Sequence, residues 1–276
     1  MPSLAHCRKQ NRLDLSSLTH GREPANKPMA HSRIPSKQDL TSLTLSEEPA
    51  SKLTEGLICH YNFETGSVSG STVTDLTGNY PGSLTGSPTI VDGLYGKALN
   101  LNGSSQWLTL NNSTSLLQGA TAFTVCAGLN CTAMHGAIPG GNGSSFFAKG
   151  LSYAYDLLCA MDNNGNNYLQ VNVGADGANG YSDSSVYGRY IVYSMVFDGT
   201  QSVNADRIKI YENLNQKSLW LGYTVPAAVS TQGGNAVIGM YPPAGSMIFL
   251  GQIEFFRLYN RAMTLEDIML VNAVNN

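Results

Sequence analysis

Carboxylate pairs are the first residues to look for in a chain that could hydrolyse a polysaccharide. Cleavage of a glycosidic bond normally uses two carboxyl groups that flank the bond, one of them held protonated. Glu254 stands alone in an aromatic segment, with Arg257 and Arg261 close behind it in the chain. We therefore expect Glu254 to pair with one of these arginines, and we expect no catalytic residues and no enzyme activity.

Nucleophilic and phosphate-binding sites also lack their usual residues. Beyond residue 55 the sequence contains two histidines, His60 and His135, and neither accompanies a recognisable serine or cysteine motif. The glycine-rich stretch 136–143 has no lysine, and no helical pattern follows it. His60 falls within a predicted strand, which favours a solvent-facing or hydrogen-bonded residue over a catalytic base.

Tyrosine and amide side chains offer the chemistry of sugar binding. Sugars are held by planar aromatic rings and by hydrogen bonds from Asn, Asp and Gln side chains. We predict a glycan site on the polar connection 174–189, with Tyr181 as the stacking ring; ordinary strand tyrosines are the alternative. The candidate residues are Asp176, Asn179, Tyr181, Asp183 and Tyr187.

Composition favours a globular all-β protein. Apolar residues make up 42% of the chain, charged residues 13%, and there are 29 glycines, a mixture typical of strands joined by tight turns. The net charge of −3 indicates no general attraction to nucleic acid or to an anionic membrane. No apolar run is long enough for membrane insertion, and residues 1–15 do not resemble a secretory signal. The five cysteines, without CxxC spacing, favour free thiols in a reducing compartment over disulfides or a metal site.

The first 55 residues differ from the rest of the chain. Residues 1–55 contain 8 Lys or Arg, 6 Asp or Glu and no Phe, Trp or Tyr. Residues 56–276 contain 8 Lys or Arg, 13 Asp or Glu and every Phe, Trp and Tyr of the chain. A segment with so few large apolar groups cannot bury enough surface to offset its ordering entropy. We predict an extended polar arm over 1–55, which becomes ordered on a larger protein assembly, and a folded domain over 56–276.

Short apolar runs between turn residues predict about a dozen strands in the second part. Phe123, Val125, Ala127 and Leu129 alternate with their neighbours, which is typical of a strand. Asn164-Gly165 predicts a hairpin. Strands are expected over 57–63, 121–129, 153–161, 168–173, 190–197, 207–211, 218–224, 236–239 and 247–259.

Only the end of the chain has a helical pattern. Thr264 can cap a helix whose third residue is Asp267, and Leu265, Ile268 and Met269 are expected to share one face of it. The pattern as a whole predicts an all-β fold: an antiparallel two-sheet jelly-roll sandwich with one short C-terminal helix and an extended N-terminal arm.

Five segments, in this order, carry a resemblance to a known family. They are 57–64, 74–79, 93–103, 121–125 and 251–263. The last, Gly-Gln-Ile-Glu-Phe-Phe-Arg-Leu-Tyr-Asn-Arg-Ala-Met, is similar to the pattern Gly-x-Ile-Asp-x-x-Arg-Ile-Tyr-Asn-Arg-Ala-Leu of the laminin-G-like branch of the concanavalin A-like jelly rolls. The resemblance implies that Gly78, Gly96 and Gly103 adopt positive φ. It also implies that the space between the sheets is filled by Tyr61, Phe63, Phe123, Ile253 and Tyr259.

The same resemblance implies what the rim of the sandwich could bind. Related domains hold Ca²⁺ there with carboxylates from separate loops, and the candidates in this chain are Asp162, Asp176 and Asp183. Residues 162–166 resemble the start of a calcium loop, but Val173 stands where a bidentate acid is needed. Asn, Asp and Gly clusters are what ordinary turns need, so plain turns are favoured and no cofactor is expected, with Ca²⁺ as the alternative. Related glucanases carry Glu-x-Asp-x-x-Glu on one strand, a motif that this sequence lacks.

Two functions of different classes remain open. The first is a structural component of a virion, such as a phage capsid or tail decoration protein. Its arm would bind capsid or tail proteins, and its sandwich would contact a host glycan. The second is a bacterial extracellular or cell-surface carbohydrate-binding or adhesin module. A glucanase-like hydrolase is opposed by the missing acids. A sandwich fold does not decide between these functions.

Overall fold

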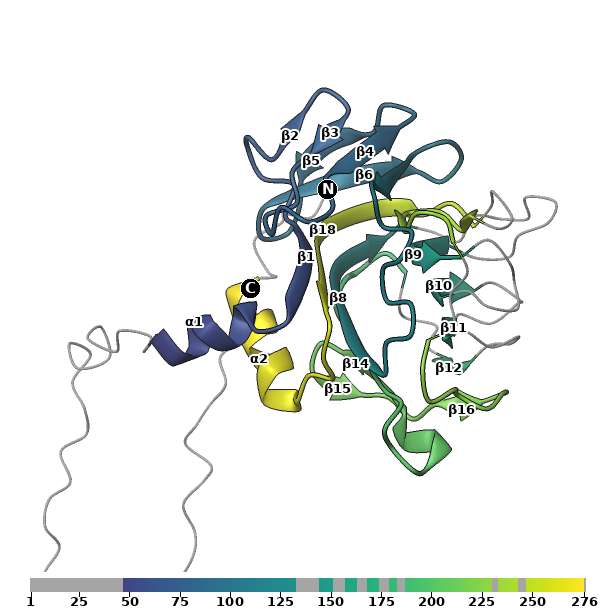
Figure 1. Ribbon diagram of the computed structural model, residues 1–276. Coiled ribbons are helices and arrows are strands. Elements are labelled where there is room, and N and C mark those ends of the chain that lie inside the picture. Colours follow the sequence, from purple (N-terminus) through teal and green to yellow (C-terminus); the bar gives the residue numbers. More distant parts are fainter. Residues whose placement is uncertain are drawn as a thin grey trace, which may run out of the picture. The chain divides into compact units, whose positions relative to one another are not determined.

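A computed structural model describes residues 47–132, 144–150, 157–162, 168–173, 179–182, 187–229, 233–242 and 247–275. The strands of these residues form two sheets of antiparallel pairs, with a short helix at the C-terminal end (Figure 1). The predicted all-β two-sheet sandwich with a short C-terminal helix is therefore confirmed.

Sheet A has β8 and β18 near its centre. Its eight described strands follow the order β15-β14-β13-β8-β18-β6-β5, and β1 pairs with β18 as well. The long strands β8 and β13 pair from Tyr190 opposite Asn130 to Asp198 opposite Ala122. The strands are β1 (Leu57–Tyr61), β5 (Thr89–Asp92), β6 (Lys97–Asn102), β8 (Ala122–Cys131), β13 (Tyr190–Asp198), β14 (Ile208–Glu212), β15 (Asn215–Gln216) and β18 (Leu250–Tyr259).

Sheet B contains ten described strands in the order β16-β12-β11-β10-β9-β17-β7-β4-β3-β2. β10 and β11 pair with Asp162 opposite Tyr168, as the predicted Asn-Gly hairpin requires. The strands are β2 (Val68–Ser69), β3 (Thr72–Val73), β4 (Gly82–Thr85), β7 (Trp107–Leu110), β9 (Ser144–Lys149), β10 (Leu157–Asp162), β11 (Tyr168–Val173), β12 (Asn179–Ser182), β16 (Trp220–Leu221) and β17 (Val237–Ile238).

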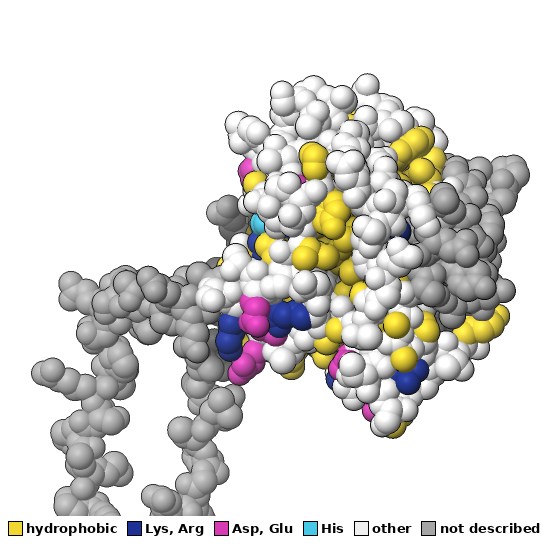
Figure 2. Space-filling view, in the orientation of Figure 1, with side chains coloured by type: hydrophobic (Ala, Val, Ile, Leu, Met, Phe, Trp, Pro, Cys, Tyr) yellow, Lys and Arg dark blue, Asp and Glu magenta, His cyan; other side chains and the backbone are white. Residues whose placement is uncertain are grey.

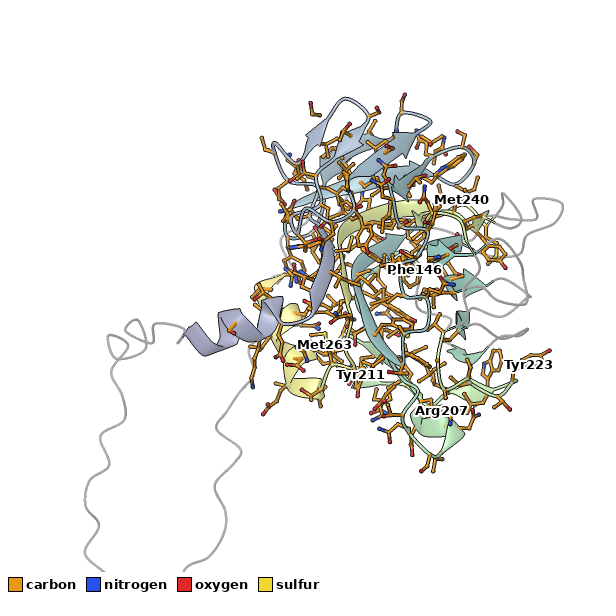
Figure 3. All side chains as sticks on the ribbon, in the orientation of Figure 1. Phe146, Arg207, Tyr211, Tyr223, Met240 and Met263 are labelled. Carbon is orange, nitrogen blue, oxygen red and sulfur yellow. The ribbon has the colours of Figure 1, made fainter. Side chains whose placement is uncertain are left out.

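The main core fills the space between the two sheets. The alternating residues Phe123, Val125, Ala127 and Leu129 of β8 all belong to it, as their period of two predicts. Phe146 of sheet B lies between the sheets (Figure 3), and its ring meets the edge of a sheet A tyrosine at 4.8 Å between centroids. Each fully buried aromatic or aliphatic side chain contributes about 1.5–3 kcal/mol, so this layer is the main source of stability.

A second apolar cluster lies on the outer face of sheet A. Helices α1 (Glu47–Thr54) and α2 (Leu265–Val274) lie on the other side of sheet A from strands β9 to β12 (Figure 1). Tyr259 belongs to this outer cluster, so its predicted place between the sheets is wrong, because it alternates along β18 with Leu258, which faces the main core. The other four residues predicted there, Tyr61, Phe63, Phe123 and Ile253, do lie in the main core.

Helix α2 begins at the predicted cap, and its buried face is wider than the apolar residues alone. Thr264 and Asp267 form the capping box. The three apolar residues Leu265, Ile268 and Met269 have the spacing of one helix face, but only Ile268 is buried, whereas Leu265 and Met269 are 46% and 50% exposed. The buried carboxylate of Asp267 forms an ion pair with Arg261, and Asp267 shares the buried side of the helix with Ile268, Val271 and Asn272.

The last residues of the segment predicted as an arm form helix α1. Arg261 donates hydrogen bonds to the backbone oxygens of Glu55 (2.9 Å) and Lys52 (3.2 Å). Leu53 packs against the outer cluster. Basic and acidic side chains lie next to each other over α1 and α2 (Figure 2), where Lys52 pairs with Glu266. Residues 47–54 therefore pack with the sandwich, and the rest of the predicted arm, 1–46, lies outside the described residues.

Four cysteines are free and buried, as expected: Cys59, Cys126, Cys131 and Cys159. Burial raises the pKa of the Cys126 thiol to about 11, which keeps the thiol protonated and unreactive near neutral pH. Cys7 lies outside the described residues. In the described part of the chain, no helix is long and apolar enough to cross a membrane.

Candidate binding site

A pocket opens at the point where β18 changes its neighbour in sheet A. β18 pairs with β6 through Ile253 and with β1 from Phe256 onward. Its register with β8 shifts between Ile253 and Phe255, which makes Glu254 a bulged residue, and bulges often redirect a side chain beside a functional site. The pocket has a volume of about 340 Å³ and is lined by His60, Asn62, Glu64, Tyr95, Gly96, Glu254, Phe255, Arg257, Val274 and Asn275.

Glu254 is nearly buried and holds the turn between β5 and β6. Its Oε1 accepts hydrogen bonds from the backbone N–H groups of Tyr95 (2.7 Å) and Gly96 (3.2 Å). The expected pairing of Glu254 with Arg257 or Arg261 is therefore wrong. The bulge directs Glu254 toward the turn, and the two arginines bind other groups instead.

A second carboxylate completes the support of this turn. Glu64 Oε1 accepts a hydrogen bond from the backbone N–H of Lys97 at 2.8 Å. A Cβ atom on Gly93 would overlap with Glu254 Oε1, and one on Gly96 would overlap with Glu64 Oε1. At Gly93 the buried Glu254 carboxylate leaves no room for a side chain, whereas a side chain at Gly96 would displace the end of the exposed Glu64 side chain.

Two of the three glycines predicted to have a left-handed backbone adopt it. Gly78 and Gly103 have the predicted positive φ, at 78° and 69°. Gly96 is not among the positive-φ glycines, so that prediction is wrong. Its missing side chain makes room for Glu64 rather than for a left-handed backbone.

Tyr95 projects from this supported turn beside the pocket. Its side chain is 50% exposed, and its ring meets Tyr190 edge-on at 5.4 Å between centroids. The Tyr190 hydroxyl lies near Glu254, and burial together with that carboxylate raises the pKa of Tyr190. Tyr95 is therefore an exposed ring whose backbone and one edge are both held in place.

His60 and Arg257 form another wall of the pocket. Arg257 Nε donates to His60 Nε2 at 3.2 Å, and its Nη2 donates to Asn275 Oδ1 at 3.4 Å. The guanidinium also lies over the Phe255 ring. Burial and the charge of Arg257 lower the pKa of His60 to about 4, so the imidazole is neutral near pH 7. His60 is partly buried and hydrogen-bonded, as one of its two predicted roles required.

These groups suit binding better than hydrolysis. Glu64 and Glu254 both accept backbone N–H groups of the same turn through Oε1, so both carboxylates support the wall that carries Tyr95. The pocket combines an aromatic ring with carboxylate, amide and guanidinium groups, a set that can hold a polyhydroxylated ligand. Among the described residues, no group of three or more His, Cys, Asp or Glu could hold a metal ion.

The described residues among those predicted from the sequence as ligand-binding do not line this pocket. Asn179 and Tyr181 belong to β12 rather than to a loop, and β12 pairs with β11 and β16. Tyr187 is partly buried and packs against the main core. Asp176 and Asp183 lie outside the described residues.

The predicted metal ligands remain untested in the same way. Asp162 is the last residue of β10, and the structure describes its backbone pairing but not its side chain. Its two proposed partners, Asp176 and Asp183, lie outside the described residues. The Ca²⁺ site at this rim stays a prediction.

Exposed aromatic side chains do occur near β12. Trp220 of β16 stands opposite Gly180 of β12, and its exposed fraction is 39%. Tyr223 is 53% exposed and lies at the edge of the molecule on the side of β16 (Figure 3). This edge of sheet B, defined by β12, Trp220 and Tyr223, is the second surface at which a ligand could stack.

The pocket residues were missed because their signal is spread over the whole chain. Asn62, Glu64, Tyr95, Glu254 and Asn275 are far apart in sequence and meet only through β1, β18 and the β5–β6 turn. A tyrosine between two closely spaced glycines, Gly93-Leu94-Tyr95-Gly96, was the one local hint, since such a turn exposes its bulky residues.

No protein-family model and no curated protein matches the sequence. Among solved structures, domain 4 of AbnA, a GH43 extracellular arabinanase from Geobacillus stearothermophilus in complex with arabinotriose, is similar. Its TM-score is 0.58 at 20% identity, covering 80% of this chain and 98% of that one. Botulinum neurotoxin type C, which depends on interaction with two ganglioside molecules to enter cells, has a TM-score of 0.57 at 10% identity, covering 82% of this chain and 53% of that one.

Trypanosoma rangeli sialidase is also similar, with a TM-score of 0.52 at 15% identity, covering 79% of this chain and 32% of that one. Identities this low establish the fold alone, so the narrower laminin-G-like assignment stays a prediction. This chain has the β-sandwich fold that these carbohydrate-active and carbohydrate-binding proteins contain.

Proposed function

We propose that the sandwich is a non-catalytic module that binds a glycan in the pocket beside Tyr95. The observation that carries the proposal is the way Tyr95 is held: half exposed, on a turn whose backbone N–H groups bind two carboxylates of the pocket wall. A ring fixed in this way loses little conformational entropy when a ligand stacks on it.

The polar lining supports the same proposal. A pyranose or furanose presents C–H groups that pack on a ring and hydroxyl groups that both donate and accept hydrogen bonds. The Asn275 amide, the guanidinium of Arg257 and the exposed carboxylate of Glu64 line the pocket together with Tyr95. The likeness to an arabinanase domain bound to arabinotriose and to a ganglioside-dependent toxin adds support.

A glycan array probed with the intact chain tests the proposal, followed by calorimetry on the sugars that bind. Tyr95→Ala should weaken binding by about tenfold or more. Tyr223→Ala, which removes a similarly exposed tyrosine from the other side of the sandwich, is the matched control and should bind normally. Tyr181→Ala tests the site predicted from the sequence. Loss of binding in Tyr181→Ala but not in Tyr95→Ala would move the site to the edge of sheet B.

The non-catalytic part of the proposal has its own test. The protein should release no reducing sugar from a panel of polysaccharides, and Glu254→Gln should lower the melting temperature without changing any chemistry. Gln keeps one acceptor oxygen for Tyr95 and Gly96, so the loss of stability should be about 1–2 kcal/mol. Turnover that Glu254→Gln abolishes would show instead that the carboxylate is catalytic.

We further propose that the N-terminal segment anchors this module to a larger assembly. The absence of aromatic residues from 1–55 and its net positive charge favour a segment that orders on a partner. A virion, with capsid or tail proteins as that partner and a host glycan as the ligand, fits four buried free cysteines of the kind found in reducing compartments. An extracellular or cell-surface adhesin is the alternative, and the proteins that co-purify with the chain distinguish the two.

Truncation tests the anchor, and helix α1 decides where to cut. Deletion of 1–46 should leave stability within about 0.5 kcal/mol and abolish co-sedimentation with the assembly. Deletion of 1–55 should cost a further ~1–3 kcal/mol, because Arg261 loses two backbone acceptors and Leu53 leaves the outer cluster. Normal assembly without residues 1–46 would refute the anchor.

A further inference from the structure

We propose that the glycan bound beside Tyr95 is a neutral one, recognised through its hydroxyl groups, and that the pocket disfavours sugars carrying a carboxylate or sulfate. This inference rests on the proposed function and narrows its ligand class. It follows from the balance of charge in the pocket and from the groups that are already engaged.

The ionisable groups of the pocket wall leave a formal excess of negative charge. Glu64 and Glu254 supply two carboxylates, and Arg257 supplies one guanidinium. His60 does not add a second positive charge near neutral pH, because its Nε2 accepts the hydrogen bond from Arg257 Nε and must therefore be unprotonated. Its lowered pKa agrees with this geometry. The formal sum is −1, so an anionic ligand would be repelled.

Arg257 is not arranged to hold an anion from the side. Side-on binding of a carboxylate uses Nε and Nη2 together as a fork. In this pocket Nε donates to His60 and Nη2 donates to Asn275. The one cation of the wall therefore has its side-on fork directed at protein groups.

Glu64 is arranged to accept hydroxyl groups. Its Oε1 is fixed by the backbone N–H of Lys97, and the side chain is exposed, which leaves its second oxygen open to a ligand. The Lys97 ammonium forms its ion pair with Asp92, and its attraction to Glu64 is weaker than its attraction to Asp92. A fixed carboxylate oxygen accepts strongly from a neutral sugar hydroxyl and repels a sugar carboxylate.

Matched sugar pairs test the inference. Binding is measured by calorimetry for a galactose-terminated oligosaccharide and its sialylated form, and for a glucan and a glucuronate oligomer of equal length. The wild-type protein should bind the neutral member of the pair at least about tenfold more tightly. Glu64→Gln should bind the neutral sugar about tenfold more weakly, because the amide replaces an acceptor oxygen with a donor. The difference in affinity between the neutral and the acidic sugar should therefore become smaller.

Glu266→Gln is the matched control, because it makes the same substitution on an exposed carboxylate of α2 that is not part of the pocket lining. It should leave the discrimination unchanged. Tighter binding of the acidic sugars, or an equal effect of both substitutions, would overturn the inference. If Tyr95→Ala still abolishes that binding, the proposed function survives and only the charge selectivity fails. Binding of neither sugar class on the array would overturn both.

Discussion

The turn that carries Tyr95 and the edge of sheet B that carries Trp220 and Tyr223 expose their rings to a similar degree. Tyr95 is 50% exposed and Tyr223 is 53% exposed. The Tyr95 turn is tied by two carboxylates and borders a pocket. Trp220, in contrast, belongs to a two-residue strand at the end of its sheet. A ring held in a fixed position beside polar groups is therefore better evidence for a binding site than the exposure of a ring alone.

The largest expected effect comes from breaking the support of the Tyr95 turn. Gly93→Ala places a methyl group on the Glu254 carboxylate, so the buried acid loses two hydrogen bonds and must move. We expect about 3–5 kcal/mol of lost stability, together with loss of glycan binding. Chemical denaturation and calorimetry measure the two effects.

Gly119→Ala separates this overlap from ordinary glycine strain. Gly119 has a φ of 73°, and a Cβ atom at this position would have no other atom within 4 Å. Its substitution should therefore cost about 1 kcal/mol through backbone conformation alone. Equal losses in the two variants would mean that the carboxylate does not support the turn.

The wall of the pocket should also give the protein a pH dependence. Burial and Arg257 hold the pKa of His60 at about 4 in the folded protein, below the ordinary value of 6.5. Between about pH 6.5 and 4, His60 therefore binds a proton in the unfolded chain but not in the folded protein. The contribution of His60 to the free energy of unfolding is fully present above pH 6.5, and it should fall by about 3 kcal/mol as the pH drops toward 4.

His60→Asn supplies the control for this slope. The variant lacks the titrating group, so its stability should change much less between pH 6.5 and 4.5 in urea unfolding experiments. A wild-type protein with constant stability over that interval would show that His60 is not held neutral. Glycan binding by the wild type should stay level from pH 8 to 5.5, because His60 does not change charge there.

At the edge of sheet B the expected effects are small. Trp220→Ala and Tyr223→Ala should each cost about 1 kcal/mol or less and should leave glycan binding within about twofold of wild type. A large loss of glycan binding in either variant would instead show that the edge of sheet B is a second binding site.

The smallest effect is expected from calcium. Asp162, Asp176 and Asp183 are still the candidate ligands, and we propose that they form no tight Ca²⁺ site. Millimolar Ca²⁺ should then shift the melting temperature by less than about 1 °C, because a ligand stabilises the folded state by RT ln(1 + [L]/Kd), which is close to zero when the concentration is far below Kd. A shift of several degrees that Asp162→Asn removes would establish a metal site.

Most of the fold could be predicted from the sequence because local patterns determine it. The alternation of β8 and the capping box of Thr264 and Asp267 each need only neighbouring residues to be recognised. The buried face of α2 could not be predicted from apolar spacing, because it includes two polar residues, Asp267, which pairs with Arg261, and Asn272. Helix α1 was missed because it is polar and owes its place to Arg261, more than 200 residues later.

The candidate site was less predictable, because tertiary contacts create it. The partner of Glu254 was sought among nearby arginines, but a β-bulge directs the carboxylate to a turn 159 residues away. Gly96 was assigned a left-handed backbone when its actual constraint is Glu64. Glycines and acids stand out in a sequence, but nothing local shows which acid lies against which glycine.

The most direct test of the central claim is an NMR titration of the folded protein with a neutral oligosaccharide taken from the array. We predict that the backbone amides of Gly93 to Lys97 and the Asn275 side-chain amide shift on binding, while the indole N–H of Trp220 keeps its position. A shifted Trp220 signal with an unchanged Tyr95 turn would contradict the account and place the glycan on the opposite side of the sandwich.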